Sequence, residues 1–228
     1  MRLWITRTEP GAHDTAARLA ARGHDPVIAP LLVVRALSSD SADPVPTHAA
    51  LAFTSRNAVA VWAAIRPDRA PPVFCVGDGT AEAARAVGFT DVRSASGDAR
   101  ALAALIRDAA AGPVLVPGPT RPAADLTALV GPDVTVLPRA VYETVEADVA
   151  APGPIDGILF HSARAAVAFA RNHAASAPGR IALALSDAVA EPLMALGFAG
   201  VHIAARPDEH SLLDALDAQT LGKPPRPV

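Results

Sequence analysis

Residues 51–59 read LAFTSRNAV and residues 158–167 read ILFHSARAAV, so the chain carries two versions of one segment. Each version is an apolar run that ends in hydroxyl-bearing residues and then begins a helix-like pattern, and the two serines stand 107 positions apart. The similarity continues downstream, because the pattern of residues 82–92 returns at residues 191–201. A repeat of this length predicts two similar domains. We therefore expect a cleft between two domains, which is a common place for a ligand.

The composition of the 228-residue chain narrows its class. With 51% hydrophobic residues, each half can bury a core. The formal net charge of −3 argues against a nucleic-acid partner, which requires a concentrated basic face. Lys223 is the only lysine, so arginine supplies nearly all of the positive charge. This bias reflects either codon usage or a role for some arginines in binding carboxylates or phosphates. The planar guanidinium of arginine matches the geometry of both groups.

The sequence gives no support for a metal site, a disulfide or a membrane segment. Cys75 is the only cysteine and lies in an apolar run, and the seven histidines show no metal-ligand spacing. The first seven residues are too short and too charged for a signal peptide, and no apolar stretch is long enough to span a membrane. We expect a cytoplasmic monomer that binds no metal and contacts no membrane.

A helical pattern that ends at glycine and leads into a valine-centred strand occurs four times. Glycine after a helix adopts the left-handed conformation at low cost, and the chain then turns back as a strand. The four glycines are Gly23, Gly88, Gly131 and Gly197. Repeated alternation of helix and strand predicts an α/β protein with mostly parallel sheets flanked by helices.

The apolar runs predict about ten strands, which divide into two sets of five. The middle set lies near residues 50–54, 73–76, 91–94, 114–117 and 134–137. The outer set lies near residues 2–6, 26–30, 157–160, 181–185 and 201–204. Five strands are the complement of a flavodoxin-like, doubly wound domain with strand order 2-1-3-4-5. We expect one such domain in the middle of the chain and one built from both ends.

These strands predict where the domains begin and end. The discontinuous domain comprises residues 1–34 plus 144–221, the inserted domain comprises residues 38–139, and residues 222–228 read as a disordered tail. Residues 32–37 and 140–145 would then cross between the domains. Both stretches are short and extended in character, so we expect them to pair as a two-stranded linker.

Polar residues follow many of the predicted strands at their carboxyl ends, where doubly wound sheets bind ligands. Several are Ser, Thr or Gly at the start of a helix, and helix capping alone explains any single one of them. As a set, exposed helix N-termini flanked by arginine favour an anionic ligand. The strand-end segments are residues 6–7, 161–164, 186–187 and 206 in the outer domain and residues 54–57, 77–80, 96–97 and 117–121 in the middle domain.

Common enzyme motifs are absent from these strand ends. The sequence has no complete dinucleotide-binding fingerprint, no phosphate-binding P-loop and no nucleophile elbow. Tyr142 is the only tyrosine and lies in the second crossing. It is either a tyrosine of the core or a phenol that donates a proton at the cleft.

The chain resembles the uroporphyrinogen-III synthase family in a set of motifs that occur in order. They are ITRTEPG at residues 5–11, FTSRNAV at 53–59, VGDGTAEA at 76–83, RAVYET at 139–144 and FHS at 160–162. The resemblance implies two flavodoxin-like domains and a linear tetrapyrrole substrate, hydroxymethylbilane, which carries eight carboxylates. It implies loss of the hydroxyl as water, inversion of the last pyrrole ring through a spiro intermediate and closure of the macrocycle. No cofactor or metal is implied.

The resemblance also implies site residues. Five residues match family positions at the cleft: Arg7, Ser55, Thr80, Ser162 and Tyr142. The resemblance implies a catalytic role in hydroxyl loss for Tyr142. Together with the strand-end residues, we expect substrate binding by Arg7, Thr54, Ser55, Asn57, Gly79, Thr80, His161 and Ser162. Much of the catalysis would come from holding the ends of the bilane together.

The chain departs from the family pattern at three places. Val189 stands where a threonine is usual, His161 replaces the first residue of a Thr-Ser pair, and residues 117–119 replace a common Arg-Gly. These departures leave open a second hypothesis, a non-catalytic module of the same fold that binds a tetrapyrrole or another small anion.

Overall fold

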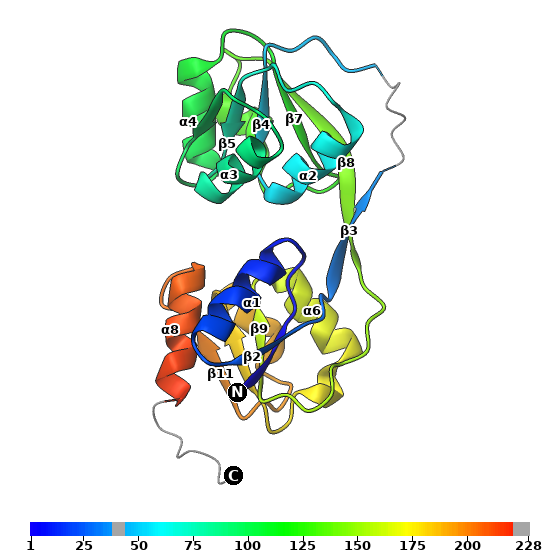
Figure 1. Ribbon diagram of the computed structural model, residues 1–228, viewed down its shortest axis with the longest axis vertical. Coiled ribbons are helices and arrows are strands. Elements are labelled where there is room, and N and C mark those ends of the chain that lie inside the picture. Colours follow the sequence, from blue (N-terminus) through cyan, green and yellow to red (C-terminus); the bar gives the residue numbers. More distant parts are fainter. Residues whose placement is uncertain (38–43, 221–228) are drawn as a thin grey trace. The chain divides into compact units, whose positions relative to one another are not determined.

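The computed structural model describes residues 1–37 and 44–220, which divide into two compact units (Figure 1). Unit 1 contains Met1–Val33 and Val145–Val228, and unit 2 contains Val34–Thr144. The chain therefore leaves unit 1 once and returns to it, which makes unit 2 an insertion. The predicted tail at residues 222–228, and residue 38 at the expected start of the inserted domain, lie outside the described residues.

Unit 1 is a five-stranded parallel sheet, drawn in blue and in yellow to red in Figure 1. Its strands are β1 (Arg2–Ile5), β2 (Asp25–Ile28), β9 (Gly157–Phe160), β10 (Ile181–Ala184) and β11 (Gly200–Ile203). Its helices are α1 (Gly11–Ala21), α6 (Ala163–Asn172), α7 (Asp187–Ala190) and α8 (Glu209–Thr220), with 3₁₀ turns at Ala174–Ser176 and Glu191–Leu193. The strand order is β11-β10-β9-β1-β2. Counted along the unit's own chain, this is the predicted order 2-1-3-4-5.

The helices of unit 1 cover both faces of its sheet because side chains alternate along each strand. Leu3 and Ile5 of β1 pack in one core with residues of α1 and α8. Trp4, between them, packs in a second core with residues of α6 and α7. This arrangement is the doubly wound fold that the alternation of helices and strands predicted.

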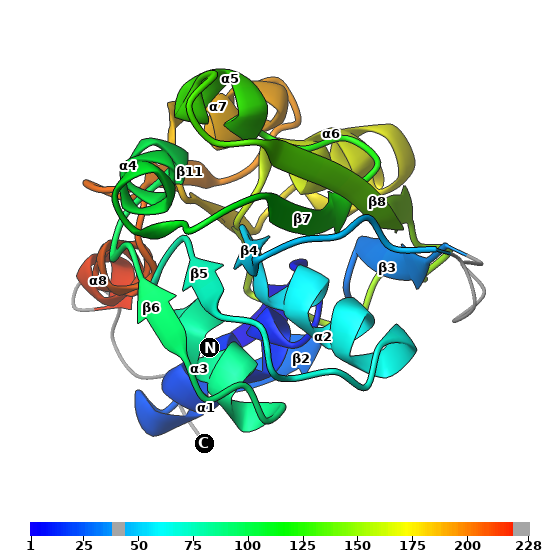
Figure 2. The same cartoon turned by 90° about the horizontal axis from the view of Figure 1, so that it is seen from above.

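Unit 2 has the same layered architecture with a six-stranded sheet. Its strands are β3 (Leu32–Ala36), β4 (Ala50–Phe53), β5 (Val73–Cys75), β6 (Val92–Ser94), β7 (Val114–Pro119) and β8 (Val136–Glu146). Its helices are α2 (Arg56–Ile65), α3 (Asp78–Ala86), α4 (Ala99–Ala109) and α5 (Leu126–Val130). Figure 2 shows the strands side by side, with α2 and α3 on one face and α4 and α5 on the other.

The strand order of unit 2 differs from the predicted one. The sheet runs β3-β8-β7-β4-β5-β6. Numbered 1 to 5 in chain order, the strands β4 to β8 therefore have the order 3-2-1-4-5 in place of the predicted 2-1-3-4-5. The chain adds β5 and β6 outward on one side of β4 and then returns to place β7 on the other side. Both orders are doubly wound, so the α/β class is confirmed while the middle order was wrong.

A second difference concerns β8. The predicted strand at residues 134–137 and the predicted crossing at 140–145 form one strand, Val136–Glu146. It pairs in parallel with β7 up to Tyr142, with an irregularity between Gly118 and Pro119. On its other side it neighbours β3. The Leu37 N–H donates to the Val141 carbonyl, and the Ala147 N–H donates to the Leu31 carbonyl. The earlier residue of one segment thus meets the later residue of the other, as two antiparallel strands require.

The four glycines expected to end helices all have a positive φ, although Gly131, with a ψ of −170°, lies outside the left-handed helical region. Gly23, Gly88, Gly131 and Gly197 have φ values of 78°, 103°, 84° and 75°. L-residues with a side chain rarely adopt this region, so glycine is the residue of choice. Gly197 does not directly follow a helix, because α7 ends at Ala190 and the 3₁₀ turn after it ends at Leu193.

Candidate functional site

Each sheet has a point where the chain leaves two neighbouring strands in opposite directions, and ligands of doubly wound proteins bind there. In unit 1 this switch point lies between β1 and β9, which are neighbours in the sheet. Thr6, directly after β1, is fully buried, and both its N–H and its hydroxyl donate to the carbonyl of Leu159 in β9. The two strand ends are therefore bonded together just before Arg7 and His161.

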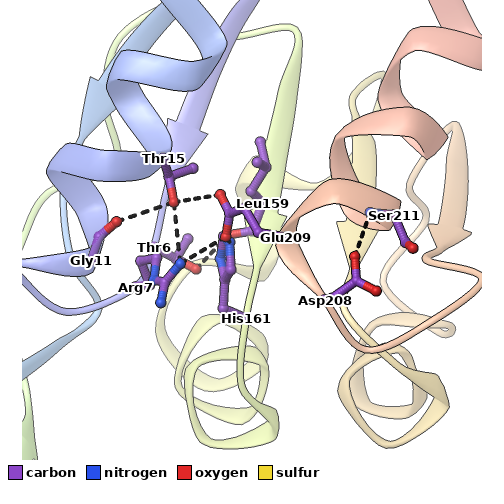
Figure 3. Close-up of polar contacts among 9 residues, drawn as sticks. All are labelled: Thr6, Arg7, Gly11, Thr15, Leu159, His161, Asp208, Glu209 and Ser211. Atoms are coloured by element: carbon purple, nitrogen blue, oxygen red, sulfur yellow. Dashed lines mark hydrogen bonds and ion pairs between the residues drawn. The ribbon is translucent and has the colours of Figure 1, made fainter. Parts of the chain in front are cut away.

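A polar cluster of Arg7, Thr15, His161 and Glu209 lies at this switch point, and we call it the Glu209 cluster (Figure 3). Its members come from the ends of β1 and β9, from α1 and from α8. The Arg7 guanidinium donates to Glu209 Oε2 at 2.8 Å, and Thr15 Oγ1 donates to Oε1 at 2.7 Å. His161 Nε2 lies 3.0 Å from Oε2. The two predicted binding residues Arg7 and His161 thus share one carboxylate.

The pKa values of Glu209 and His161 are both shifted in the cluster. Burial lowers the pKa of His161, and Arg7 lowers it further, although Glu209 acts in the opposite direction. Burial alone would raise the pKa of Glu209, but His161, Thr15 and Arg7 together lower it to about 2. At neutral pH Glu209 is therefore ionised and His161 is uncharged, so the Nε2–H donates to the carboxylate. The other ring nitrogen, Nδ1, is buried without a hydrogen-bond partner among the described residues.

Two further residues hold the cluster in place. A Cβ atom on Gly11 would lie 2.8 Å from the Arg7 guanidinium, so the absence of a side chain there lets Arg7 lie against α1. Asp208 accepts a hydrogen bond from the Ser211 N–H and so caps the first turn of α8 (Figure 3). Glu209 is in that first turn, where the helix dipole favours a negative charge.

In unit 2 the corresponding switch point lies between β4 and β7. Ser55 follows β4, accepts the Ala58 N–H at 3.1 Å as the cap of α2, and lies 3.1 Å from the Tyr142 hydroxyl. Tyr142 comes from β8 and is 4% exposed. Burial raises the pKa of its phenol, and the hydrogen bond with Ser55 offsets part of that rise. Tyr142 therefore holds its proton at neutral pH.

The remaining predicted residues lie at helix N-termini. Ser162 caps α6 through the Ala165 N–H at 3.2 Å, as the capping alternative anticipated. Asn57 lies in the first turn of α2, and Gly79 and Thr80 lie in the first turn of α3. Thr54 is the half-buried residue between β4 and Ser55. The structure thus brings Ser55 and Tyr142 into direct contact in unit 2 and joins Arg7 to His161 through Glu209 in unit 1.

The sequence did not point to Glu209, Thr15 or a hydroxyl network around Asp78. Asp78 accepts hydrogen bonds from Ser94 at 2.6 Å and from Ser96 at 2.9 Å, and these lower its pKa. The only signal for this network was that its three residues lie at or just after the ends of predicted strands. Glu209 carried no signal, because nothing in its spacing relates it to Arg7 or His161.

The described residues show no arrangement for a metal ion and no helix with the length and apolar character needed to cross a membrane. Over residues 1–37 and 44–220, no three His, Cys, Asp or Glu side chains come together as potential ligands. No helix in this part of the chain is long and apolar enough to span a bilayer. Burial raises the pKa of the Cys75 thiol to about 11, so it is protonated at neutral pH.

Two doubly wound units, with hydroxyl groups at both switch points and charged groups at that of unit 1, are typical of an α/β protein that binds a polar small molecule. The family is shown by residues 13–214, which match the family described as uroporphyrinogen-III synthase HemD. The chain belongs to the uroporphyrinogen-III synthase family. Its function is the synthase activity of that family, a hydro-lyase reaction on a tetrapyrrole in haem biosynthesis.

Solved structures support the fold. The uroporphyrinogen-III synthetase of Helicobacter pylori 26695 matches with a TM-score of 0.65 at 18% identity, over 96% of this chain and 100% of that one. A mutant uroporphyrinogen III synthase from the extremely thermophilic bacterium Thermus thermophilus matches with a TM-score of 0.53 at 14% identity, over 98% of this chain and 100% of that one. A comparison with curated proteins gave no significant match.

Proposed function

We propose that Tyr142 is the catalytic residue that assists loss of the hydroxyl from hydroxymethylbilane. The observation that carries this proposal is the 3.1 Å contact between the Tyr142 and Ser55 hydroxyls at the switch point of unit 2. Either hydroxyl can donate in this contact, and Ser55 also accepts from the Ala58 N–H. In the arrangement where Ser55 donates to Tyr142, the phenolic hydrogen is available to the substrate. A phenol with a raised pKa is a donor at neutral pH, which suits hydrogen bonding to a departing hydroxyl.

The proposed reaction balances without a cofactor. The substrate hydroxyl leaves with a proton as water, and a cationic azafulvene remains. The last pyrrole ring attacks through its substituted carbon to form the spiro intermediate, and rearrangement inverts that ring. Closure of the macrocycle then releases one proton, which restores the acid and gives uroporphyrinogen III.

Substrate binding is proposed at the helix N-termini of both units. The N-termini of α2, α3 and α6 suit the carboxylates of the bilane, because helix N-termini favour an anion. The residues are Thr54, Ser55, Asn57, Gly79 and Thr80 in unit 2 and Ser162 in unit 1. Arg7 and His161, also expected to bind the substrate, are already bonded to Glu209. Binding the whole bilane in one conformation would bring its ends together, which lowers the entropic barrier to cyclisation.

The decisive experiment is an isomer assay. Freshly prepared hydroxymethylbilane is incubated with the protein, and the products are oxidised and resolved by chromatography. We expect the type III isomer in excess over the type I isomer, which forms spontaneously. Type I product alone, at the rate of the buffer control, would refute the proposal.

A second candidate is a module that binds a polycarboxylate without turnover. Two observations favour it: Glu209 already bonds Arg7 and His161, and the buried Val189 has no polar group to offer a ligand. Tight binding of uroporphyrin combined with type I product alone would support this candidate over the synthase.

We also propose a cytoplasmic monomer that binds no nucleic acid, in keeping with the net charge of −3. Residues 1–34 with 144–221, and residues 38–139, are the proposed folding units. Light scattering of the purified protein tests the monomeric state, since a monomer has a mass of 23.3 kDa. Limited proteolysis tests the boundaries of the folding units, because cleavage is expected between the units.

A further inference from the structure

Glu209 is bound in unit 1 much as a ligand carboxylate would be. Its two oxygens take donors from three separate segments: Arg7 after β1, Thr15 on α1 and His161 after β9. Figure 3 shows these side chains gathered around the Glu209 carboxylate. The side chain of Glu209 is only 15% exposed and that of His161 only 7%. A charge-assisted set of this kind is typical of a tight carboxylate site.

The position of Glu209 strengthens the comparison with a ligand. The carboxyl ends of β1 and β9 flank the switch point of unit 1, where doubly wound folds hold the anionic part of a ligand. Here α8, the last helix of the same unit, delivers the anion. The Asp208 cap starts α8 one residue before Glu209, so the carboxylate is presented by an ordered helix end.

The charges of the cluster cancel. Arg7 carries one positive charge and Glu209 one negative charge, and the buried His161 is neutral at neutral pH. Arg7 would attract an approaching substrate carboxylate only weakly, because the Glu209 carboxylate already lies 2.8 Å from its guanidinium. The Glu209 cluster is therefore polar but close to neutral overall.

We propose that Glu209 is a specificity-determining residue that occupies the carboxylate site of unit 1 and so keeps substrate carboxylates away from Arg7 and His161. This inference rests on the proposed synthase reaction and deepens it. Loss of the hydroxyl leaves a cationic azafulvene, and an unpaired arginine beside that cation would raise its energy. With the arginine neutralised, unit 1 accepts an uncharged or cationic part of the bilane, and the carboxylates bind at helix N-termini.

The test measures binding of uroporphyrin III, a stable octacarboxylate, by fluorescence at low and high salt. Glu209→Gln keeps the shape of the side chain but removes its charge, which exposes the charge of Arg7. Its affinity is expected to rise about three- to tenfold at low salt, the scale of one added charge pair at a partly solvated site, and to fall more steeply with salt. Asp25→Asn removes the same charge from the opposite end of the sheet in unit 1, and its affinity should stay near that of the wild type.

A double variant keeps the test independent of how well the single variant folds. Arg7→Gln with Glu209→Gln removes both charges and leaves two amides that can hydrogen bond to each other. We expect its affinity to stay within about twofold of the wild type, because the charges it removes already cancel. Affinity that is unchanged or weaker in Glu209→Gln, or more than about fivefold weaker in the double variant, overturns the inference, since Arg7 would then bind the substrate directly.

The binding assay separates this inference from the proposed function. Type III product from the wild type together with unchanged affinity in Glu209→Gln would refute the role of Glu209 and leave the synthase reaction standing. Type I product alone together with tighter binding in Glu209→Gln would refute the reaction and support an occupied carboxylate site.

Discussion

The Glu209 cluster predicts how the stability of unit 1 depends on pH. The pKa of Glu209 falls from an ordinary 4.5 to about 2 in the folded protein. Each pKa unit corresponds to about 1.4 kcal/mol, so the ionised carboxylate contributes about 3 kcal/mol to folding at neutral pH. A lowered carboxyl pKa stabilises above the unfolded value and loses that effect as the pH falls toward the folded value. About 2 kcal/mol should therefore be lost between pH 6 and pH 3.

His161 adds a change of the same sign. Because burial lowers its pKa below 6.5, the unfolded chain binds a proton there more readily than unit 1 does as the pH falls. Glu209 raises the pKa of His161, so replacing Glu209 also changes this contribution. The gap in unfolding free energy between wild type and Glu209→Gln therefore reports the carboxylate together with its coupling to His161. We expect the gap to be about 3 kcal/mol at pH 6 and to narrow by at most about 2 kcal/mol at pH 3.

The assay is urea unfolding followed by tryptophan fluorescence. Trp4 is fully buried in unit 1, and Trp62 is the other tryptophan and lies in unit 2. A Trp62→Phe background therefore makes the signal specific to unit 1. Asp25→Asn serves as the control, and a change below about 0.5 kcal/mol is expected at both pH values because Asp25 is exposed. A gap for Glu209→Gln that is the same at pH 6 and pH 3, or absent at pH 6, would refute the reasoning.

Four other substitutions test single contacts. Tyr142→Phe is expected to lower turnover of hydroxymethylbilane severalfold with uroporphyrin binding little changed, and full turnover would reduce the phenol to a structural role. Ser55→Ala removes a helix cap and the partner of Tyr142, so it should cost about 1 kcal/mol in stability and also slow turnover. Ser162→Ala removes a cap but no partner of Tyr142, so a similar stability loss with faster turnover than Ser55→Ala is expected, and equal turnover in both would argue against a role for Ser55 beyond capping. Gly11→Ala places a methyl group 2.8 Å from the Arg7 guanidinium and should lower the melting temperature by roughly 2–4 °C, whereas an unchanged melting temperature would show that Arg7 can move away freely.

The sequence was most informative where local rules act. The positive φ of Gly23 and Gly131, and the capping by Ser55 and Ser162, follow from chain geometry within a few residues. The parallel α/β class follows from the same local alternation. Arg7 and His161 meet because parallel strands end at one edge, which strand counting can reveal.

What the sequence could not reveal depends on contacts between distant segments. Glu209 reaches Arg7 only because α8 packs beside α1, and no periodicity predicts which side chain then projects into the cluster. The order of strands in unit 2 depends on which side of β4 receives the next strand, and a hydrophobic run has no preference for either side. The fusion of two expected elements into β8 was hidden by Pro138, which lies inside the strand although proline usually marks its end.

The insertion of unit 2 into unit 1 has a consequence for synthesis on the ribosome. β1 and β2 emerge first, but the next neighbour of β1 is β9, which begins only at Gly157. At usual rates of translation this leaves an incomplete sheet, with Leu3, Trp4 and Ile5 uncovered, for roughly 10 s. Unit 2 is complete within that interval and can fold without waiting for the rest of the chain. These three side chains, fully buried in the folded protein, therefore lack their native neighbours for a defined window of biogenesis.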